Sequence, residues 1–260
     1  MEKPYQNKNE LLARCEQIRL ATTGIVAKHI NKRFSLPISR WVVTHTRWTP
    51  NQITYFNIFL GLLSGFVASK GTLFSLFIGG LLFQIVSIMD GVDGEVAKLT
   101  NTSSQWGQWL DTISDNGSLA SFMIGISVGL YRIDPQGPVI SLTITTFGAI
   151  AFMIGTMLIF LKKETNSGSL VTYDKEFLST IQPDQFPIAS RAIHALKYGV
   201  KKDFYSLIFF LACLFQKPSW VLYLCAYGGI IACVFMAYIH IMTWIDRECG
   251  SVPLQGERFL

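Results

Sequence analysis

The sequence predicts an all-α integral membrane protein, with six transmembrane helices and an N-terminal amphipathic interfacial helix. Of its 260 residues 50% are hydrophobic and only 15% are charged, whereas a typical soluble domain has about 25% charged residues. The apolar residues fall in six blocks. Most basic residues lie before the first block, in every second connection between blocks and after the last block. Both patterns are typical of a chain that is partly surrounded by lipid.

The first predicted element is a juxtamembrane segment, residues 1–48. From Leu11 to Val43 apolar residues alternate with basic ones. This pattern predicts a helix that lies in the membrane interface with its basic face toward the headgroups. Because proline disrupts a helix interior, Pro37 is expected to divide the segment into two short helices.

Six apolar blocks follow, and a transmembrane helix needs roughly 20 predominantly apolar residues. The fifth block is short and depends on its flanks. The predicted spans are 52–69, 72–89, 108–131, 138–161, 204–217 and 219–245. Together they form a six-helix bundle over 49–245, and residues 1–260 are predicted to be a single membrane domain. The loop 162–203 is long for a bundle and is interpreted either as a linker or as a lid on the substrate side.

The placement of basic residues predicts the orientation. They gather before the first span, in the second and fourth loops and after the last span; those of the N-terminal segment are Lys3, Lys8, Arg14, Arg19, Lys28, Lys32, Arg33, Arg40 and Arg47. The opposite side has only Lys70, Arg132 and Lys217. The positive-inside rule then places both termini and the loop 162–203 in the cytoplasm. Anionic lipid headgroups account for the net charge of +5, so no nucleic-acid partner is expected.

Four aspartates stand at the boundary between the second and third spans. Asp90 and Asp93 are three residues apart, while Asp111 and Asp115 are four apart, so each pair lies on one helical face. A short connection is expected to bring all four carboxylates together at the cytoplasmic boundary. Glu95, in the same stretch, is expected to be solvated.

Four crowded carboxylates repel one another unless cations compensate them. Hard oxygen ligands suit Mg²⁺, Mn²⁺ or Ca²⁺, and two such ions could clamp a diphosphate. Gly94 allows a phosphate-bearing ligand to approach the backbone, and Gly107 leaves room one turn before Asp111. These spacings favour a metal site over simple capping of helix ends.

The run from Asp90 to Asp115 resembles the signature of the CDP-alcohol phosphotransferase family. That signature has two aspartates, a glycine, an Ala-Arg pair, a second glycine and two further aspartates. The one departure is Lys98, where the family has arginine; lysine keeps the charge but loses the bidentate fork. Because of this departure, a further alternative is that the chain is an inactive member of the family. The flanking runs, including "HINKRFSLPISR", "SIMDGVDGE" and the Lys202-Asp203 pair, resemble the branch of di-inositol-phosphate phosphate synthases.

The resemblance implies a role for each matching residue. Asp90, Asp93 and Asp111 are implied metal ligands, and Asp115 is implied both as a ligand and as the general base. The implied binding site for the CDP part consists of Thr49, Pro50, Asn51, Gln52, Gly94, Lys98 and Ser104. The implied cofactor is Mg²⁺, as two ions, with Mn²⁺ as an alternative.

The implied reaction transfers a phosphoalcohol group from a CDP-alcohol to an alcohol or lipid acceptor and releases CMP, with the active site on the cytoplasmic side. Basic residues of the fourth loop are candidates for a phosphate on the acceptor: Lys162, Lys163, Arg191, Lys197, Lys201 and Lys202. Family members are often homodimers, and an apolar third or sixth span could serve that purpose. Two other classes remain open, a membrane prenyltransferase that uses an isoprenoid diphosphate and a non-enzymatic cation transporter.

Overall fold

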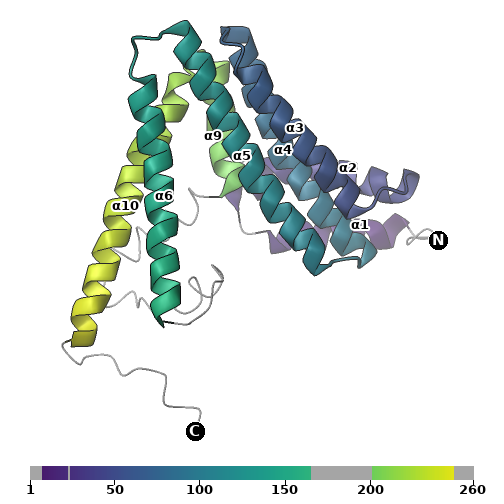
Figure 1. The fold of residues 1–260 in the computed structure, drawn as a ribbon. Helices are drawn as coiled ribbons and strands as arrows, with labels where there is room; N and C mark the ends of the chain where they lie inside the picture. Colours follow the sequence, from purple (N-terminus) through teal and green to yellow (C-terminus); the bar gives the residue numbers. More distant parts are fainter. Residues whose placement is uncertain (1–7, 23, 165–200, 249–260) are drawn as a thin grey trace. The chain divides into compact units, whose positions relative to one another are not determined.

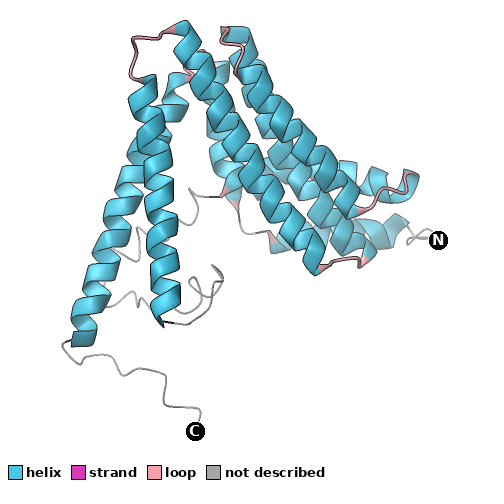
Figure 2. Cartoon of the chain, in the orientation of Figure 1, coloured by secondary structure: helices cyan, strands magenta, loops and turns pink. Residues whose placement is uncertain are grey.

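A computed structural model describes residues 8–22, 24–164 and 201–248, and every regular element in these ranges is a helix (Figure 1; Figure 2). The prediction of an all-helical protein is therefore confirmed. Most of the predicted loop 162–203 lies outside the described residues. The chain divides into two compact units, residues 1–139 with 183–221 and residues 140–182 with 222–260.

The N-terminal segment forms α1 (Lys8–Ala21), the π-helical turn η1 (Ala27–Asn31) and α2 (Lys32–His45). The prediction that Pro37 breaks the segment is wrong, because α2 runs through this proline. The segment breaks earlier, after Ala21, because Thr22 and Gly24 are not helical. Pro37 cannot donate the helical hydrogen bond, but α2 is held on α4 at this point by the buried Leu36 and by the hydrogen bond from Ser39 to Glu95.

These N-terminal helices pack on the helix that carries the first aspartate pair. Their common core consists of Leu11, Cys15, Leu36, Val42, Val43, Ile53, Val92, Val96 and Leu99. Burial raises the pKa of the Cys15 thiol, and the nearby charge of Glu95 raises it further. Cys15 therefore serves as a small apolar residue of this core.

Helix α3 (Pro50–Ala68) begins with a capping box, in which the Thr49 side chain accepts from the Gln52 backbone and the Gln52 side chain accepts from Thr49 N. Helix α4 (Leu73–Thr100) has a similar box at Thr72. It continues well beyond the predicted span 72–89, so Asp90, Asp93 and Lys98 all lie on a helix rather than in a loop. It ends at Asn101, whose left-handed conformation (φ 53°) is one that asparagine tolerates.

Helix α5 (Gln105–Ile133) starts at Ser104, whose hydroxyl accepts from the Gly107 backbone at 3.0 Å. Only residues 101–104 separate it from α4, which brings the two aspartate pairs to one end of the bundle. Helices α3 and α5 approach each other so closely that a Cβ at Gly125 would collide with the backbone of Gly65. Small residues at such crossings are typical of helices packed in lipid.

We expect Gly125→Ala and Gly117→Ala, both on α5, to change stability in opposite directions. An added methyl at position 125 has no room and should destabilise the protein by about 1–3 kcal/mol. At position 117 a Cβ meets nothing within 4 Å, so alanine should stabilise the helix by about 0.5–1 kcal/mol. Thermal unfolding of the two purified variants measures the difference. Equal midpoints would contradict the close approach of α3 and α5.

Helix α9 (Lys202–Leu214) packs against α4. Phe83 of α4 stacks on Phe122 of α5, with ring centroids 4.6 Å apart, and both rings also contact Phe209 of α9. These three aromatic side chains hold together the helices that carry the acidic residues. Aromatic pairs of this kind contribute about 0.5–1.5 kcal/mol beyond their burial.

The second unit contains most of α6 (Val139–Glu164) and of α10 (Ser219–Glu248). The two helices run side by side (Figure 1), and the Thr156 hydroxyl donates to the sulfur of Met236 at 3.1 Å. A Cβ at Gly229 would lie 2.8 Å from that of Ala149, so the helices are in close contact there.

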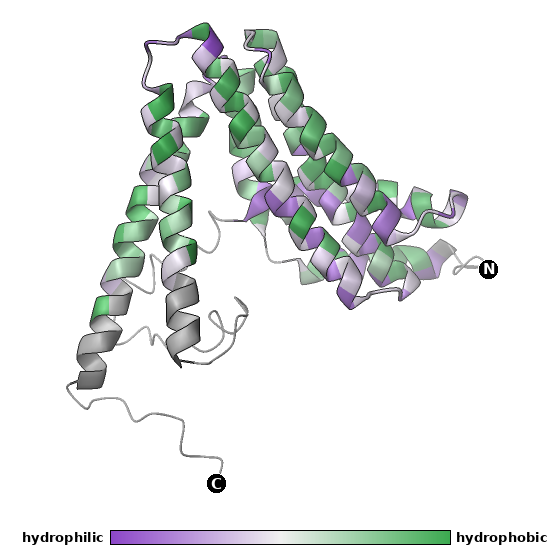
Figure 3. Ribbon diagram, viewed as in Figure 1, coloured by the Kyte–Doolittle hydropathy of each residue, from purple (hydrophilic) through white to green (hydrophobic). Residues whose placement is uncertain are grey.

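All six predicted spans coincide with helices, and three of these helices are long and apolar enough to cross a membrane. The three are Leu73–Thr100, Val139–Thr156 and Ser219–Tyr238, among the described residues. Hydrophobic residues cover the described lengths of α6 and α10, whereas hydrophilic ones gather where α2, α4 and α5 meet (Figure 3). The structure thus has three candidate membrane spans and a polar region at one end of α4.

Candidate functional site

Three of the four predicted carboxylates converge. One oxygen from each of Asp90, Asp111 and Asp115 lies within 4.8 Å of the other two. Asp90 comes from α4 and the other two from successive turns of α5, so the spacing that predicted a shared face is confirmed for Asp111 and Asp115. Each of the three side chains is partly buried.

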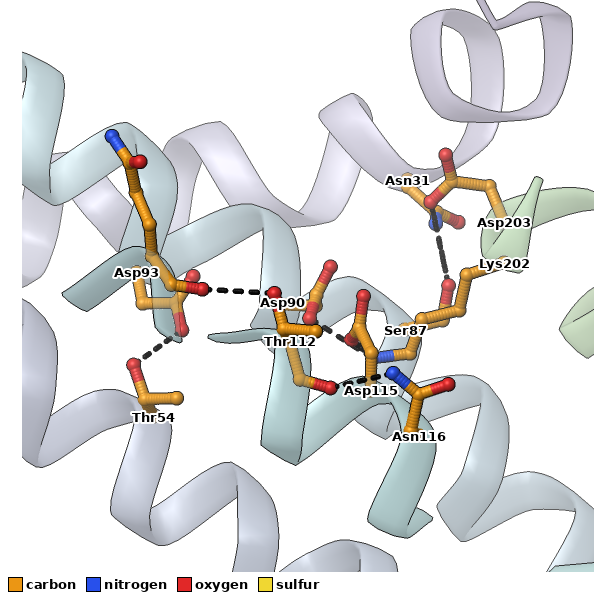
Figure 4. Close-up of polar contacts among 11 residues, drawn as sticks. Asn31, Thr54, Ser87, Asp90, Asp93, Thr112, Asp115, Asn116, Lys202 and Asp203 are labelled. Carbon is orange, nitrogen blue, oxygen red and sulfur yellow. Dashed lines mark hydrogen bonds and ion pairs between the residues drawn. The ribbon is translucent and has the colours of Figure 1, made fainter. Parts of the chain in front are cut away.

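Asp93 lies one helical turn from Asp90 but is not part of this group of three. Its side chain is buried, at 5% exposure, and its Oδ2 accepts a hydrogen bond of 2.6 Å from the Thr54 hydroxyl of α3 (Figure 4). Thr54 itself was not predicted as a site residue. The contact fixes Asp93 on the wall of the pocket that Asp90 and Asp111 also line.

Lys202, the first residue of α9, supplies a positive charge to the group. Its Nζ donates to Asp90 Oδ1 at 2.9 Å and also to Asp115 Oδ1, and the three side chains point toward one another (Figure 4). In the sequence Lys202 is a candidate for binding a phosphate on the acceptor and part of the Lys202-Asp203 pair of the family resemblance, not a predicted partner of the aspartates. Its pairing with carboxylates more than eighty residues earlier has no local signal in the chain.

A polar network anchors α9 beside this lysine. The Asn31 amide donates to Asp203 Oδ1 at 2.6 Å and to the Ser87 hydroxyl at 3.2 Å, and Gln84 donates to Asn31 Oδ1 at 3.1 Å. Asn31 is buried and closes the π-helical turn η1. Such π-helical turns are frequent at functional sites.

A pocket of about 240 Å³ opens beside the carboxylates. It lies between the starts of α3 and α5 and the last turns of α4. Of the predicted donor-binding residues, five line it: Pro50, Asn51, Gly94, Lys98 and Ser104. Thr49 and Gln52 do not line it, because their side chains cap α3.

The two glycines of the pattern have different surroundings. A Cβ at Gly94 would meet nothing within 4 Å, so this position is open, as expected where a ligand approaches the backbone. A Cβ at Gly107 would lie 3.2 Å from Ser104 Oγ and 3.3 Å from Asn51 Oδ1. A side chain there would therefore displace two polar residues of the pocket.

The prediction that Glu95 is solvated is wrong. Its side chain is 1% exposed and faces α2, where the Lys32 ammonium lies 2.6 Å from Oε1. The prediction failed because it placed Glu95 in a loop, whereas α4 continues through this position.

The donor set fits a hard divalent cation. Carboxylate oxygens are the ligands that Mg²⁺, Mn²⁺ and Ca²⁺ prefer, and the oxygens of Asp90, Asp111 and Asp115 are close enough to share an ion. Counted as ionised, these three carboxylates and Lys202 carry two negative charges in excess. The arrangement can therefore bind a metal next to the pocket between α3, α4 and α5.

Known relatives are similar to part of this chain. A bifunctional IPC transferase and DIPP synthase from Aquifex aeolicus is 36% identical over 107 residues, which are 41% of this chain and 24% of that protein. The protein of the same name from Thermococcus kodakarensis is 38% identical over 100 residues, or 38% of this chain and 22% of that protein. The chain thus spans about a quarter of the length of these two relatives.

A CDP-diacylglycerol–serine O-phosphatidyltransferase from Helicobacter pylori is 36% identical over 104 residues, which are 39% of this chain and 42% of that protein. The family model described as CDP-alcohol phosphatidyltransferase matches residues 47–183, more than half of the chain. That range includes the four aspartates, the pocket and the start of α3. The chain therefore belongs to the CDP-alcohol phosphatidyltransferase family.

Proposed function

We propose that this protein transfers a phosphoalcohol group from a CDP-alcohol to an acceptor hydroxyl and releases CMP. The observation that carries the proposal is the convergence of Asp90, Asp111 and Asp115 beside the pocket between α3, α4 and α5. Carboxylates can hold a metal there, and the open backbone at Gly94 leaves room for phosphates. The relatives are named as an IPC transferase and DIPP synthase and as a CDP-diacylglycerol–serine O-phosphatidyltransferase, which supports transfer from a CDP-linked donor.

The donor site consists of the pocket residues Pro50, Asn51, Gly94, Lys98 and Ser104, with Thr49 and Gln52 shaping the start of α3. Lys98 provides a positive charge on the α4 wall, where the donor phosphates would lie. Asp90, Asp93, Asp111 and Asp115 are the proposed ligands of two Mg²⁺ ions, with Mn²⁺ as an alternative. Bound divalent ions neutralise a diphosphate and stabilise the negative charge of a departing phosphate.

Asp115 is the proposed general base. Its carboxylate takes the proton of the acceptor hydroxyl while the acceptor oxygen bonds to the phosphorus that carries the donor alcohol. The bond from that phosphorus to the oxygen shared with CMP breaks, and CMP leaves with the electron pair. Lys202 donates to Asp115 Oδ1 and Asp90 Oδ1, which holds both carboxylates in place. Its charge also suits an anionic group on the acceptor.

We infer six spans in a single membrane domain, with α1 and α2 at the interface and the site and both termini in the cytoplasm. Large apolar side chains stay exposed along α3, namely Tyr55, Phe56, Phe59, Leu62 and Phe66, which supports contact of this shorter helix with lipid. A homodimer through the third or sixth span stays a prediction.

The test is CMP release by the purified chain in detergent with Mg²⁺. CDP-diacylglycerol, CDP-glycerol and CDP-inositol are each offered with and without alcohol acceptors. We expect CMP release with one donor class, dependent on an acceptor and abolished by a chelator. Consumption of an isoprenoid diphosphate instead would favour a prenyltransferase, and ion flux in vesicles without CMP release would favour a cation transporter.

A further inference from the structure

Glu95 is a buried carboxylate that the proposed reaction does not use. Three side chains of α2 donate to it: Lys32 at 2.6 Å and Ser35 at 2.5 Å to Oε1, and Ser39 at 2.5 Å to Oε2. Both serines are fully buried, and the Lys32 side chain is 13% exposed. A buried charge is costly unless it is paired and hydrogen-bonded in this way, so the cluster joins α2 firmly to α4.

The cluster lies on the back of the site. Glu95 follows Gly94 directly, but a step of about 100° per residue turns its side chain away from the pocket face. Val92 and Leu99, which flank it on the same side of α4, pack in the core shared with α1 and α2. The packing of α2 against α4 therefore restrains the rotation of the last turns of α4, which carry Gly94 and Lys98.

The same helix also leads to the opposite wall of the pocket. After α2 ends at His45, residues 46–49 connect it to α3, whose first turn places Pro50 and Asn51 on the pocket. Helix α2 is thus bonded to α4, which forms one wall of the pocket, and is followed in the chain by α3, whose start forms the other wall. The position of α2 therefore contributes to the distance between Asn51 and the α4 wall, together with the direct hydrogen bond from Thr54 of α3 to Asp93 of α4.

We propose that Glu95 is a positioning residue: through Lys32, Ser35 and Ser39 it fixes α2 on α4 and so holds the two walls of the donor pocket in register. This inference rests on the proposed function, because the pocket is taken to bind the CDP part of the donor. Loss of the Glu95 contacts is therefore expected to change the affinity for the donor rather than the rate of the chemical step.

The experiment compares the full-length chain with Glu95→Gln, Lys32→Met and the double variant Lys32→Met/Glu95→Gln. CDP binding in the presence of Mg²⁺ is measured by calorimetry, and KM for the donor and kcat by CMP release. Glu95→Gln is expected to weaken CDP binding and raise the donor KM by about ten-fold, within the range that loss of a supporting contact costs, with kcat little changed. The double variant should recover much of the loss, because no unpaired buried ammonium remains.

Glu16→Gln is the matched control. Glu16 also bonds to a cation of the N-terminal segment, Arg19, but both side chains are about half exposed, so CDP binding should be unchanged. If Glu95→Gln does not fold, Ser39→Ala removes one contact and leaves the ion pair; a rise in the donor KM of about two- to three-fold is expected from a single lost hydrogen bond.

The outcomes separate the two proposals. No CDP binding by the unaltered protein would refute the proposed function. Equal CDP binding by the unaltered protein and a folded Glu95→Gln or Ser39→Ala variant would refute the positioning role alone. A fall in kcat with an unchanged donor KM would also refute it, because the effect would then lie outside the donor pocket.

Discussion

Replacing Asp115 by asparagine is expected to lower the rate of CMP release by about a thousand-fold or more, within the range attributed to general bases, while CDP still binds. Asparagine keeps the shape of the side chain but cannot take up the acceptor proton. Asp90 and Asp111 remain beside the pocket, and the five donor-lining residues are untouched. The loss should therefore appear in kcat, with a smaller change in the affinity for CDP.

The measurement is CMP release at saturating donor, paired with calorimetric CDP binding in Mg²⁺. Asp134→Asn is the matched control, because Asp134 follows the other end of α5, where its carboxylate accepts a hydrogen bond from Gln136 N at 3.2 Å. It should behave as the unaltered protein. Full turnover by Asp115→Asn would remove the general-base assignment, and loss of CDP binding would show that Asp115 acts mainly in ground-state binding.

The acidic half of the site was predictable because its geometry is local. Residues three or four apart on a helix share a face whatever the rest of the chain does, so Asp111 and Asp115 meet as expected. The pairing of α4 with α5 follows from the short connection at residues 101–104. Ser104 was assigned to the donor site only through the family resemblance; the structure also makes its hydroxyl the cap of α5.

The basic half was not predictable from local pattern. Lys202 and Asp203 reach the site only because α9 packs on α4, and Asn31 reaches Asp203 across 172 positions of the chain. The sequence singles out Lys202 and Asp203 only by resemblance and as a possible acceptor contact, and nothing in it pairs them with the aspartates or with Asn31. The prediction for Glu95 failed for a related reason. An acidic residue in a predicted loop is expected to face solvent, whereas Glu95 is buried because α2 packs against α4.

The acidic group beside the pocket is not neutralised by the lysine that contacts it. Asp90, Asp111 and Asp115 lie together with Lys202, so the group carries two negative charges in excess when all are ionised. A divalent cation matches that excess. Replacing Asp111 by asparagine halves it and removes one ligand, whereas replacing Lys202 by methionine raises it to three and removes a cation that competes for Asp90 and Asp115.

We therefore expect Mg²⁺ to stabilise the unaltered protein and the Lys202→Met variant but not Asp111→Asn. At about 100 times its dissociation constant a ligand adds about 2.7 kcal/mol to the free energy of unfolding, a shift of several degrees that thermal unfolding with and without Mg²⁺ resolves. Asp111→Asn should also lose CMP release almost completely. Lys202→Met should need less Mg²⁺ for half of the shift, because its carboxylates no longer pair with an ammonium group. A weaker response to Mg²⁺ in Lys202→Met than in the unaltered protein would show that the lysine supports the metal site rather than competing with it.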